Sequence, residues 1–137
     1  MRLYGPTGVR STPTDRNPTT VAVMAGTFTA TAAVQTLATY TVPAGRRALL
    51  AVVCQGVVDA VLTGRGELTI VVSPGGLGAQ TMPYETRLAA VAGDQVNGAI
   101  QAIQLKATDV VQVQGLLSVA GGTFIMNGGI QGVEYDA

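Results

Sequence analysis

The chain of 137 residues contains no histidine and no tryptophan, and it has one cysteine and one lysine. Without histidine, the sequence lacks the commonest general base and the commonest metal ligand in proteins. Cys54 has no partner for an intramolecular disulfide and lies in an apolar run, so we interpret it as a buried and inert thiol. These absences disfavour histidine-based catalysis, most metal centres and a disulfide framework.

Charge is also scarce. Charged residues make up 12% of the chain, about half the usual share, while hydrophobic residues make up 47% and the mean hydropathy is +0.38. Eight basic residues balance eight acidic ones, so no net field is expected to attract nucleic acid. The apolar runs are shorter than the roughly 20 residues of a membrane helix, and no secretory signal is expected at the start. We therefore predict an exterior that is largely covered by other subunits.

No group of reactive side chains stands out. Lys106 lies at the end of a predicted strand, where a solvated charge is the expected state. Glu134 and Asp136 share one face of the last predicted strand, but a calcium site needs six or more oxygen ligands. The glycine-rich stretches 64–66 and 75–78 lack the Gly-Lys-Ser/Thr ending of a phosphate loop and indicate turns. We predict no catalytic residue, no cofactor, no metal site, no small-molecule substrate and therefore no enzyme.

Residues 1–19 differ in composition from the rest of the chain. They hold three prolines, several Thr and Ser residues, and three arginines against one acid. Such a segment cannot build a packed element, which predicts an extended N-terminal arm, with a disordered tail as the alternative. Fully extended, the arm would reach about 60 Å, far enough to cross a neighbouring subunit. The side chains expected to make that contact are Leu3, Tyr4, Arg10 and Arg16.

The remaining residues, 20–137, predict one β-domain that is organised around residues 39–53. Tyr40 and Val42 alternate with threonines, as in a half-buried strand, and a Pro-x-Gly turn follows. Arg46 and Arg47 are expected in water at the mouth of the next strand. The run 48–53 has no polar residue, which predicts a central strand covered on both faces.

Alternation and turn signals predict the other strands. The expected strands are a first one holding Val21, Val23 and Phe28, then 31–41, 68–72, 82–92, 111–114 and 130–135. Segments 116–120 and 123–126 predict a hairpin around Gly121-Gly122, and Asn127-Gly128-Gly129 is a further hairpin signal. Residues 94–105 fit a helix or a strand, and we favour a loop followed by a strand. Eight to ten short strands without a convincing helix predict an all-β, jelly-roll-like antiparallel β-sandwich.

Three short segments carry a resemblance to a known group of proteins. Residues 40–48, Tyr-Thr-Val-Pro-Ala-Gly-Arg-Arg-Ala, resemble the Y-T-V-P-A-G-K/R-R-A opening of small β-sandwich proteins of tailed-phage virions. Residues 105–111 resemble the L-x-A-G-D-x-V segment of the same proteins, except that Thr108 replaces the usual glycine. Residues 132–135 are similar to their closing G-x-E strand. Together the segments cover roughly residues 40 to 135.

The resemblance implies a virion protein, either a capsid decoration (cement) protein or a tail-fibre tip, and such proteins are commonly trimeric. The chain shows no repetitive shaft, and an arm is what a decoration protein needs to tie neighbours together. We therefore expect a homotrimer that binds the major capsid protein on the outer head surface and stabilises the capsid by arm exchange, after synthesis in the host cytoplasm. A tail-tip, receptor-binding protein is the alternative.

Overall fold

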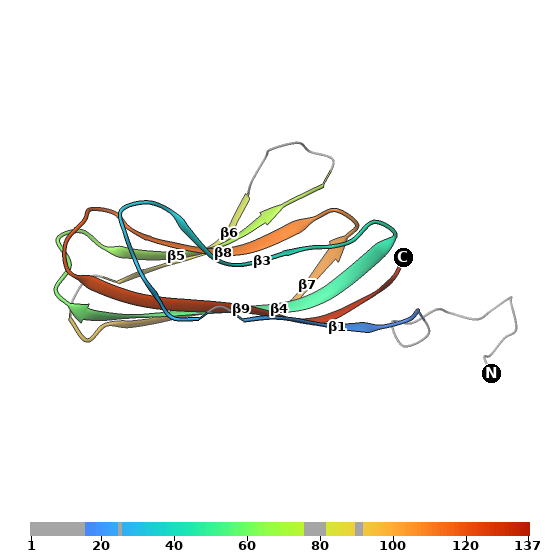
Figure 1. Cartoon of the computed structure of the whole chain (residues 1–137), viewed down its shortest axis with the longest axis horizontal. Helices are drawn as coiled ribbons and strands as arrows, with labels where there is room; N and C mark the ends of the chain where they lie inside the picture. Colours follow the sequence, from blue (N-terminus) through green and yellow to red (C-terminus); the bar gives the residue numbers. More distant parts are fainter. Residues whose placement is uncertain (1–15, 25, 76–81, 90–91) are drawn as a thin grey trace, which may run out of the picture.

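The computed structural model describes residues 16–24, 26–75, 82–89 and 92–137. In that part of the chain nine strands and no helix are present, and Figure 1 shows them as two stacked layers. The strands are β1 (Thr19–Met24), β2 (Phe28–Thr29), β3 (Gln35–Thr41), β4 (Arg46–Ala60), β5 (Gly66–Ser73), β6 (Met82–Ala89), β7 (Gln95–Lys106), β8 (Val110–Leu117) and β9 (Thr123–Asp136). The described residues hold no helix of the length and apolarity needed to span a membrane.

The order of the strands identifies the architecture. One sheet has the order β1-β9-β4-β7, with β2 also paired to β9, and the other has the order β3-β8-β5-β6. Every pair is antiparallel. The chain crosses repeatedly from one sheet to the other, which is the connectivity of a jelly roll. The predicted fold class, an all-β jelly-roll sandwich, is confirmed.

The centre of the first sheet is the ladder between β4, with 15 residues, and β9, with 14. Along β4 the side chains of Ala48, Leu50 and Val52 are buried between the sheets. The intervening side chains point away from the other sheet, and Val53 among them is 42% exposed. The prediction that this strand is covered on both faces is therefore wrong for the single protomer, in which only one face is covered.

The core closes around one large ring. Phe124 of β9 is fully buried, and Gly56 of β4 and Gly66 of β5 lie against it. A Cβ atom on either glycine would overlap the Phe124 ring, so only hydrogen fits at these positions. These strand glycines are required by the close approach of the aromatic ring.

Two glycine signals do not mark the turns that they predict. β9 runs without a break through Gly128 and Gly129, so no hairpin forms there. A Cβ atom on Gly128 would lie 2.7 Å from Cγ1 of Val113 in the opposite sheet, and one on Gly129 would lie 2.8 Å from the Met24 sulfur. Residues 118–122 do form a connection, but it joins β8 and β9 of different sheets, so the predicted hairpin is wrong.

Three further strand predictions need correction. The first predicted strand is split into β1 and β2. β3 begins at Gln35 and not at Thr31, because the Thr31 amide donates to the Gln35 side-chain oxygen (3.0 Å) in a local turn. β7 is a strand from Gln95 onward, where we favoured a loop. The strand predicted for 82–92 is present as β6.

Two of the segments that carry the family resemblance meet at the turn between β7 and β8. The Thr108 amide donates to the Val42 carbonyl (2.8 Å), and the Val42 amide donates to the Asp109 carbonyl (3.0 Å). The buried Asp109 carboxylate accepts hydrogen bonds from the amides of Gly75 (2.8 Å) and Lys106 (3.0 Å). Thr108 adopts φ 69°, a left-handed conformation that glycine adopts without strain and threonine does not.

Thr108→Gly should stabilise the protein by about 0.5–1 kcal/mol, because a β-branched residue is strained in the left-handed region and glycine is not. Urea unfolding monitored by circular dichroism measures the difference. Thr39→Gly, in the middle of β3, is the matched control and should destabilise the protein by up to about 1 kcal/mol. Equal losses for both variants would contradict the assignment of strain to Thr108.

Candidate functional site

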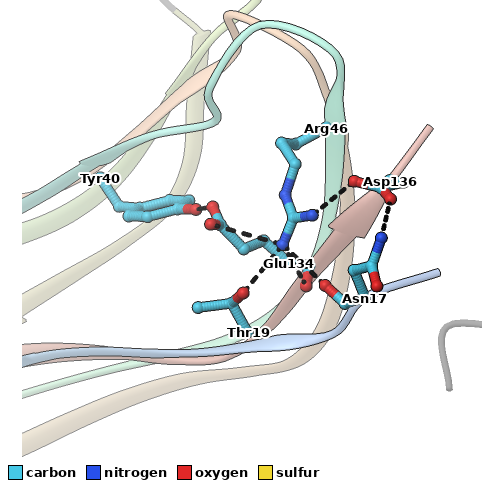
Figure 2. A network of polar contacts seen from close by, with 6 residues as sticks. All are labelled: Asn17, Thr19, Tyr40, Arg46, Glu134 and Asp136. Carbon is cyan, nitrogen blue, oxygen red and sulfur yellow. Dashed lines mark hydrogen bonds and ion pairs between the residues drawn. The ribbon is translucent and has the colours of Figure 1, made fainter.

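Where the described chain enters the sandwich, residues from its two ends and from both sheets form one polar cluster (Figure 2). We call it the arm-root cluster, because the predicted arm leads into it. Its members are Asn17, Thr19, Tyr40, Arg46, Glu134 and Asp136. Antiparallel pairing places it, since Arg46 opens β4 directly opposite Asp136 at the end of β9.

Arg46 is the centre of the cluster. Its Nη1 donates to Oδ1 of Asp136 at 2.6 Å, and its Nη2 donates to the Asn17 carbonyl (3.0 Å), to Thr19 Oγ1 (3.0 Å) and to the Glu134 carbonyl (3.2 Å). Nη2 also lies 3.7 Å from Oε1 of Glu134. The Arg46 side chain is only 16% exposed. The expectation that this arginine lies free in water is therefore wrong, because its guanidinium joins the start of the described chain to its last strand.

Backbone and side-chain contacts fix the residues that precede β1. The Asp136 amide donates to the Arg16 carbonyl (2.7 Å), and Asn17 Nδ2 donates to Oδ2 of Asp136 (2.5 Å). The hydrogen bonds from Asn17 and Arg46 lower the pKa of the Asp136 carboxyl. Asn17 itself has φ 53°, a left-handed conformation that asparagine tolerates. The direction in which the chain enters β1 is thus set by Asp136.

Tyr40 connects the cluster to the second sheet. It belongs to β3, and its hydroxyl donates to Oε2 of Glu134 in β9. Burial, followed by the hydrogen bond and the charge of Glu134, raises the pKa of the Tyr40 hydroxyl far above its ordinary value of 10.0, although the charge of Arg46 acts in the opposite direction. The carboxylate of Glu134 therefore has partners in both sheets.

The charged groups of the arm-root cluster pair with one another and hold parts of the chain together. Glu134 and Asp136 are both paired with Arg46, so these two carboxylates act as acceptors for the guanidinium. Among the described residues no group of three or more potential metal ligands is present. The geometry can hold the first described residues in one direction relative to the sandwich.

The predicted contact residues are placed only in part. Leu3, Tyr4 and Arg10 lie outside the described residues. Arg16 is the first described residue, and its main-chain carbonyl is held by Asp136 at the arm-root cluster. The cross-subunit role of all four residues, and the division into an arm at 1–19 and a domain at 20–137, remain predictions.

Sequence reasoning missed that Arg46, Glu134 and Asp136 form one unit. The signal was present, because the two acids share one strand face and Arg46 opens the strand that precedes the core. What the sequence did not show is that β4 and β9 pair with Arg46 opposite Asp136. Only that register brings the three charges together.

Arg46→Met should lower the free energy of unfolding by about 2–3 kcal/mol, because Glu134, with a side chain 15% exposed, would lose its cationic partner. Arg65→Met is the matched control, since it breaks the pair between Arg65 and Glu67, in which the arginine side chain is 55% exposed. The control should lose less than about 1 kcal/mol. Chemical denaturation of both variants gives the comparison, and similar losses would contradict a central role for Arg46.

Tyr40→Phe should reduce the loss of stability at alkaline pH. The folded protein keeps the Tyr40 proton above the ordinary pKa of 10.0, whereas the unfolded chain releases it. The stabilisation that the protonated Tyr40 hydroxyl contributes to the folded state is therefore complete below pH 10.0, and it is lost progressively as the pH rises above that value. Denaturation midpoints measured over this range should fall less steeply for Tyr40→Phe than for the control, Tyr135→Phe. Tyr135 follows Glu134 in β9, so its side chain lies on the other face of that strand. Parallel profiles would contradict the prediction.

Comparison with known proteins gives similarities in structure alone. No family model and no curated protein matches the chain. Among solved structures, the chain is similar to a protein of Bacillus endospore appendages, described as disulfide-linked pili, with 19% identity and a TM-score of 0.44 over 88% of this chain and 89% of that one. It is also similar to a chain of infectious bursal disease virus, Gx strain, with 12% identity and a TM-score of 0.46. That match covers 98% of this chain and spans only 37% of the viral one.

Proposed function

We propose that the chain is a structural virion protein that decorates the outer surface of a tailed-phage head. Three copies form the unit that binds, and the N-terminal arm of each copy contacts a neighbouring subunit or the major capsid protein. The tailed-phage assignment rests on the sequence resemblance of residues 40–48, 105–111 and 132–135.

The arm-root cluster is the observation that carries this proposal. An arm transmits force between subunits only if its base is fixed to a rigid body. Here the base is held by the Arg16 carbonyl, the Asn17 amide and the Arg46 guanidinium, all of which contact the end of β9. A force on the arm would therefore be transmitted through these contacts to the central β4–β9 ladder.

The lattice context explains why modest contacts suffice. A decoration protein binds many copies of the same site, so each arm needs only a moderate affinity for the whole layer to stay attached. Extended segments bind by adding main-chain hydrogen bonds to an exposed sheet edge, with side chains such as Leu3 and Tyr4 occupying pockets. This mode of binding requires no catalytic chemistry, in keeping with the side chains of the arm-root cluster.

Removal of residues 1–15 should abolish binding to heads assembled without this protein, while the remaining chain folds cooperatively, because Arg16 and the whole arm-root cluster are kept. Co-sedimentation with such heads measures binding, and an affinity loss of at least about a hundredfold is expected if the arm supplies the multivalent contact. A chain whose residues 1–15 have the same composition in shuffled order is the matched control and should also fail to bind.

Two results would overturn the proposal. Undiminished binding by the shortened chain would show that the arm is not the contact. Immunogold labelling of intact virions would place the protein on the tail tip if it is instead a receptor-binding protein.

A further inference from the structure

The outward side of the sheet β1-β9-β4-β7 is a second surface, distinct from the arm-root cluster. We call it the outer face. Figure 1 shows the other sheet stacked on one side of this layer. On β4 it comprises every second side chain from Arg47 to Asp59, and the paired residues of β1, β7 and β9 lie beside them. The core packs only against the inward side.

The outer face carries no charge over most of its length. In the described strands, β1 has no charged residue, β4 has none between Arg47 and Asp59, β7 has none before Lys106, and β9 has none before Glu134. On β4 four of the five outward side chains between these charges are apolar, namely Leu49, Ala51, Val53 and Val57, and the fifth is the amide Gln55. Met24 is 72% exposed and Val53 is 42% exposed. A sheet face turned to water normally carries polar side chains, whereas depletion of charge is typical of the core of a protein interface.

The depressions on the outer face are open. Two shallow, open depressions of about 400 Å³ and 490 Å³ lie along it. The first is lined by Met24, Val53 and Ala99 among others, and the second by small side chains such as Ala51 and Ala102. Met24 crosses over Gly129 at the edge of the first depression. Neither depression is enclosed or polar enough to hold a small ligand, so a protein surface is the better fit.

The charges at the two ends of the outer face identify the partner. Arg47 and Lys106 are register partners at one end, and Asp59 lies at the other end of β4, with all three exposed. Val53 stands midway between Arg47 and Asp59. A half-turn about an axis that crosses β4 at Val53, in the plane of contact, would bring the basic end of each copy over the acidic end of the other. Stacking in the same direction would instead place like charges together, which is unfavourable.

The area agrees with a stable contact. At about 3.3 Å per residue and 4.8 Å per strand, the three long strands between Arg47 and Asp59 cover about 40 by 14 Å, and the eight residues of β1 and β2 bring the outer face to about 700 Å². A typical stable interface buries about 800 Å² on each partner. We infer that the outer face binds the outer face of a second copy of this chain, in a two-fold contact with antiparallel β4 strands. Sheets packed in this way lie about 10 Å apart and cross at about −30°.

This contact is separate from the proposed decoration function. A two-fold axis relates two copies, so the proposed three-copy unit would use other surfaces and the outer faces would join two such units. The arm-root cluster lies on the inward side of the same sheet, since Arg46 and Glu134 alternate with the outward Arg47 and Tyr135. A second copy on the outer face therefore leaves the arm-root cluster uncovered. Failure of the arm to bind heads would not affect the contact between outer faces, and loss of that contact would not affect the arm.

Val53→Glu in the full chain tests the centre of the contact. The two-fold axis would bring two introduced carboxylates together in a dry interface, so self-association measured by sedimentation equilibrium should weaken by at least about a hundredfold. Val34→Glu is the matched control. Val34 is 58% exposed in the turn between β2 and β3, away from the outer face, and its substitution should leave self-association unchanged.

Charge reversal tests the antiparallel orientation. Arg47→Glu alone and Asp59→Arg alone should each weaken self-association by about tenfold at low salt, because both end contacts become repulsive. An equimolar mixture of the two variants should associate as tightly as the wild type, since a mixed pair restores an attraction at both ends. High salt should reduce these differences.

Three results of the self-association measurements alone would overturn the inference. They are a wild-type protein that remains a monomer at all concentrations, an oligomer whose mass is unchanged by Val53→Glu, and Arg47→Glu self-association equal to that of the wild type. The last result would indicate parallel stacking or no stacking. Weakening of head binding by Val53→Glu, with self-association unchanged, would show that the outer face is covered by a capsid subunit and would also reject the inference.

Discussion

The antiparallel ladder between β4 and β9 is the contact on which the rest of the structure depends. Its register places Phe124 of β9 opposite Val58 and beside Gly56, so the large ring lies between the sheets. The same register brings Arg46 opposite Asp136 at the other end. A shift of one residue would turn the core side chains outward and separate the charges. One pairing therefore determines both the core and the arm-root cluster.

The sequence was most informative where the local pattern and the tertiary structure agree. The alternation in 39–42 and the turn at Pro43 and Gly45 correctly predicted the entry to β4, and the number of strands correctly predicted a jelly roll. Thr108 is a position where an unusual residue in the sequence coincides with an unusual backbone conformation in the structure. The departure from glycine at this position was visible in the sequence, and the structure gives it a physical meaning, because the backbone there has φ 69°.

Two of the failures share one cause, which is that close packing between distant strands looks like a local signal. Gly128 and Gly129 resemble a hairpin but are small because Val113 and Met24 approach them. In β7, the spacing of Ile100 and Ile103 resembles a helix. The register against β4 shifts at this point, so that Leu50 pairs with Ile103 and Val52 with Ile100. Because of this irregularity, an odd-numbered and an even-numbered isoleucine both lie opposite inward-facing residues of β4. Neither packing partner can be identified from a single stretch of sequence.

The structure shows where the few charged residues lie and which surface lacks them. Charge is not thinly spread, since Arg46, Glu134 and Asp136 concentrate it at the arm-root cluster, while most of the outer face has none. Clustered charges fix a direction, because guanidinium and carboxylate groups bind with defined geometry. An uncharged flat face gives area without direction, and it needs charges at its ends, such as Arg47 and Asp59, to select one orientation. The sheet presents these two kinds of surface on opposite sides.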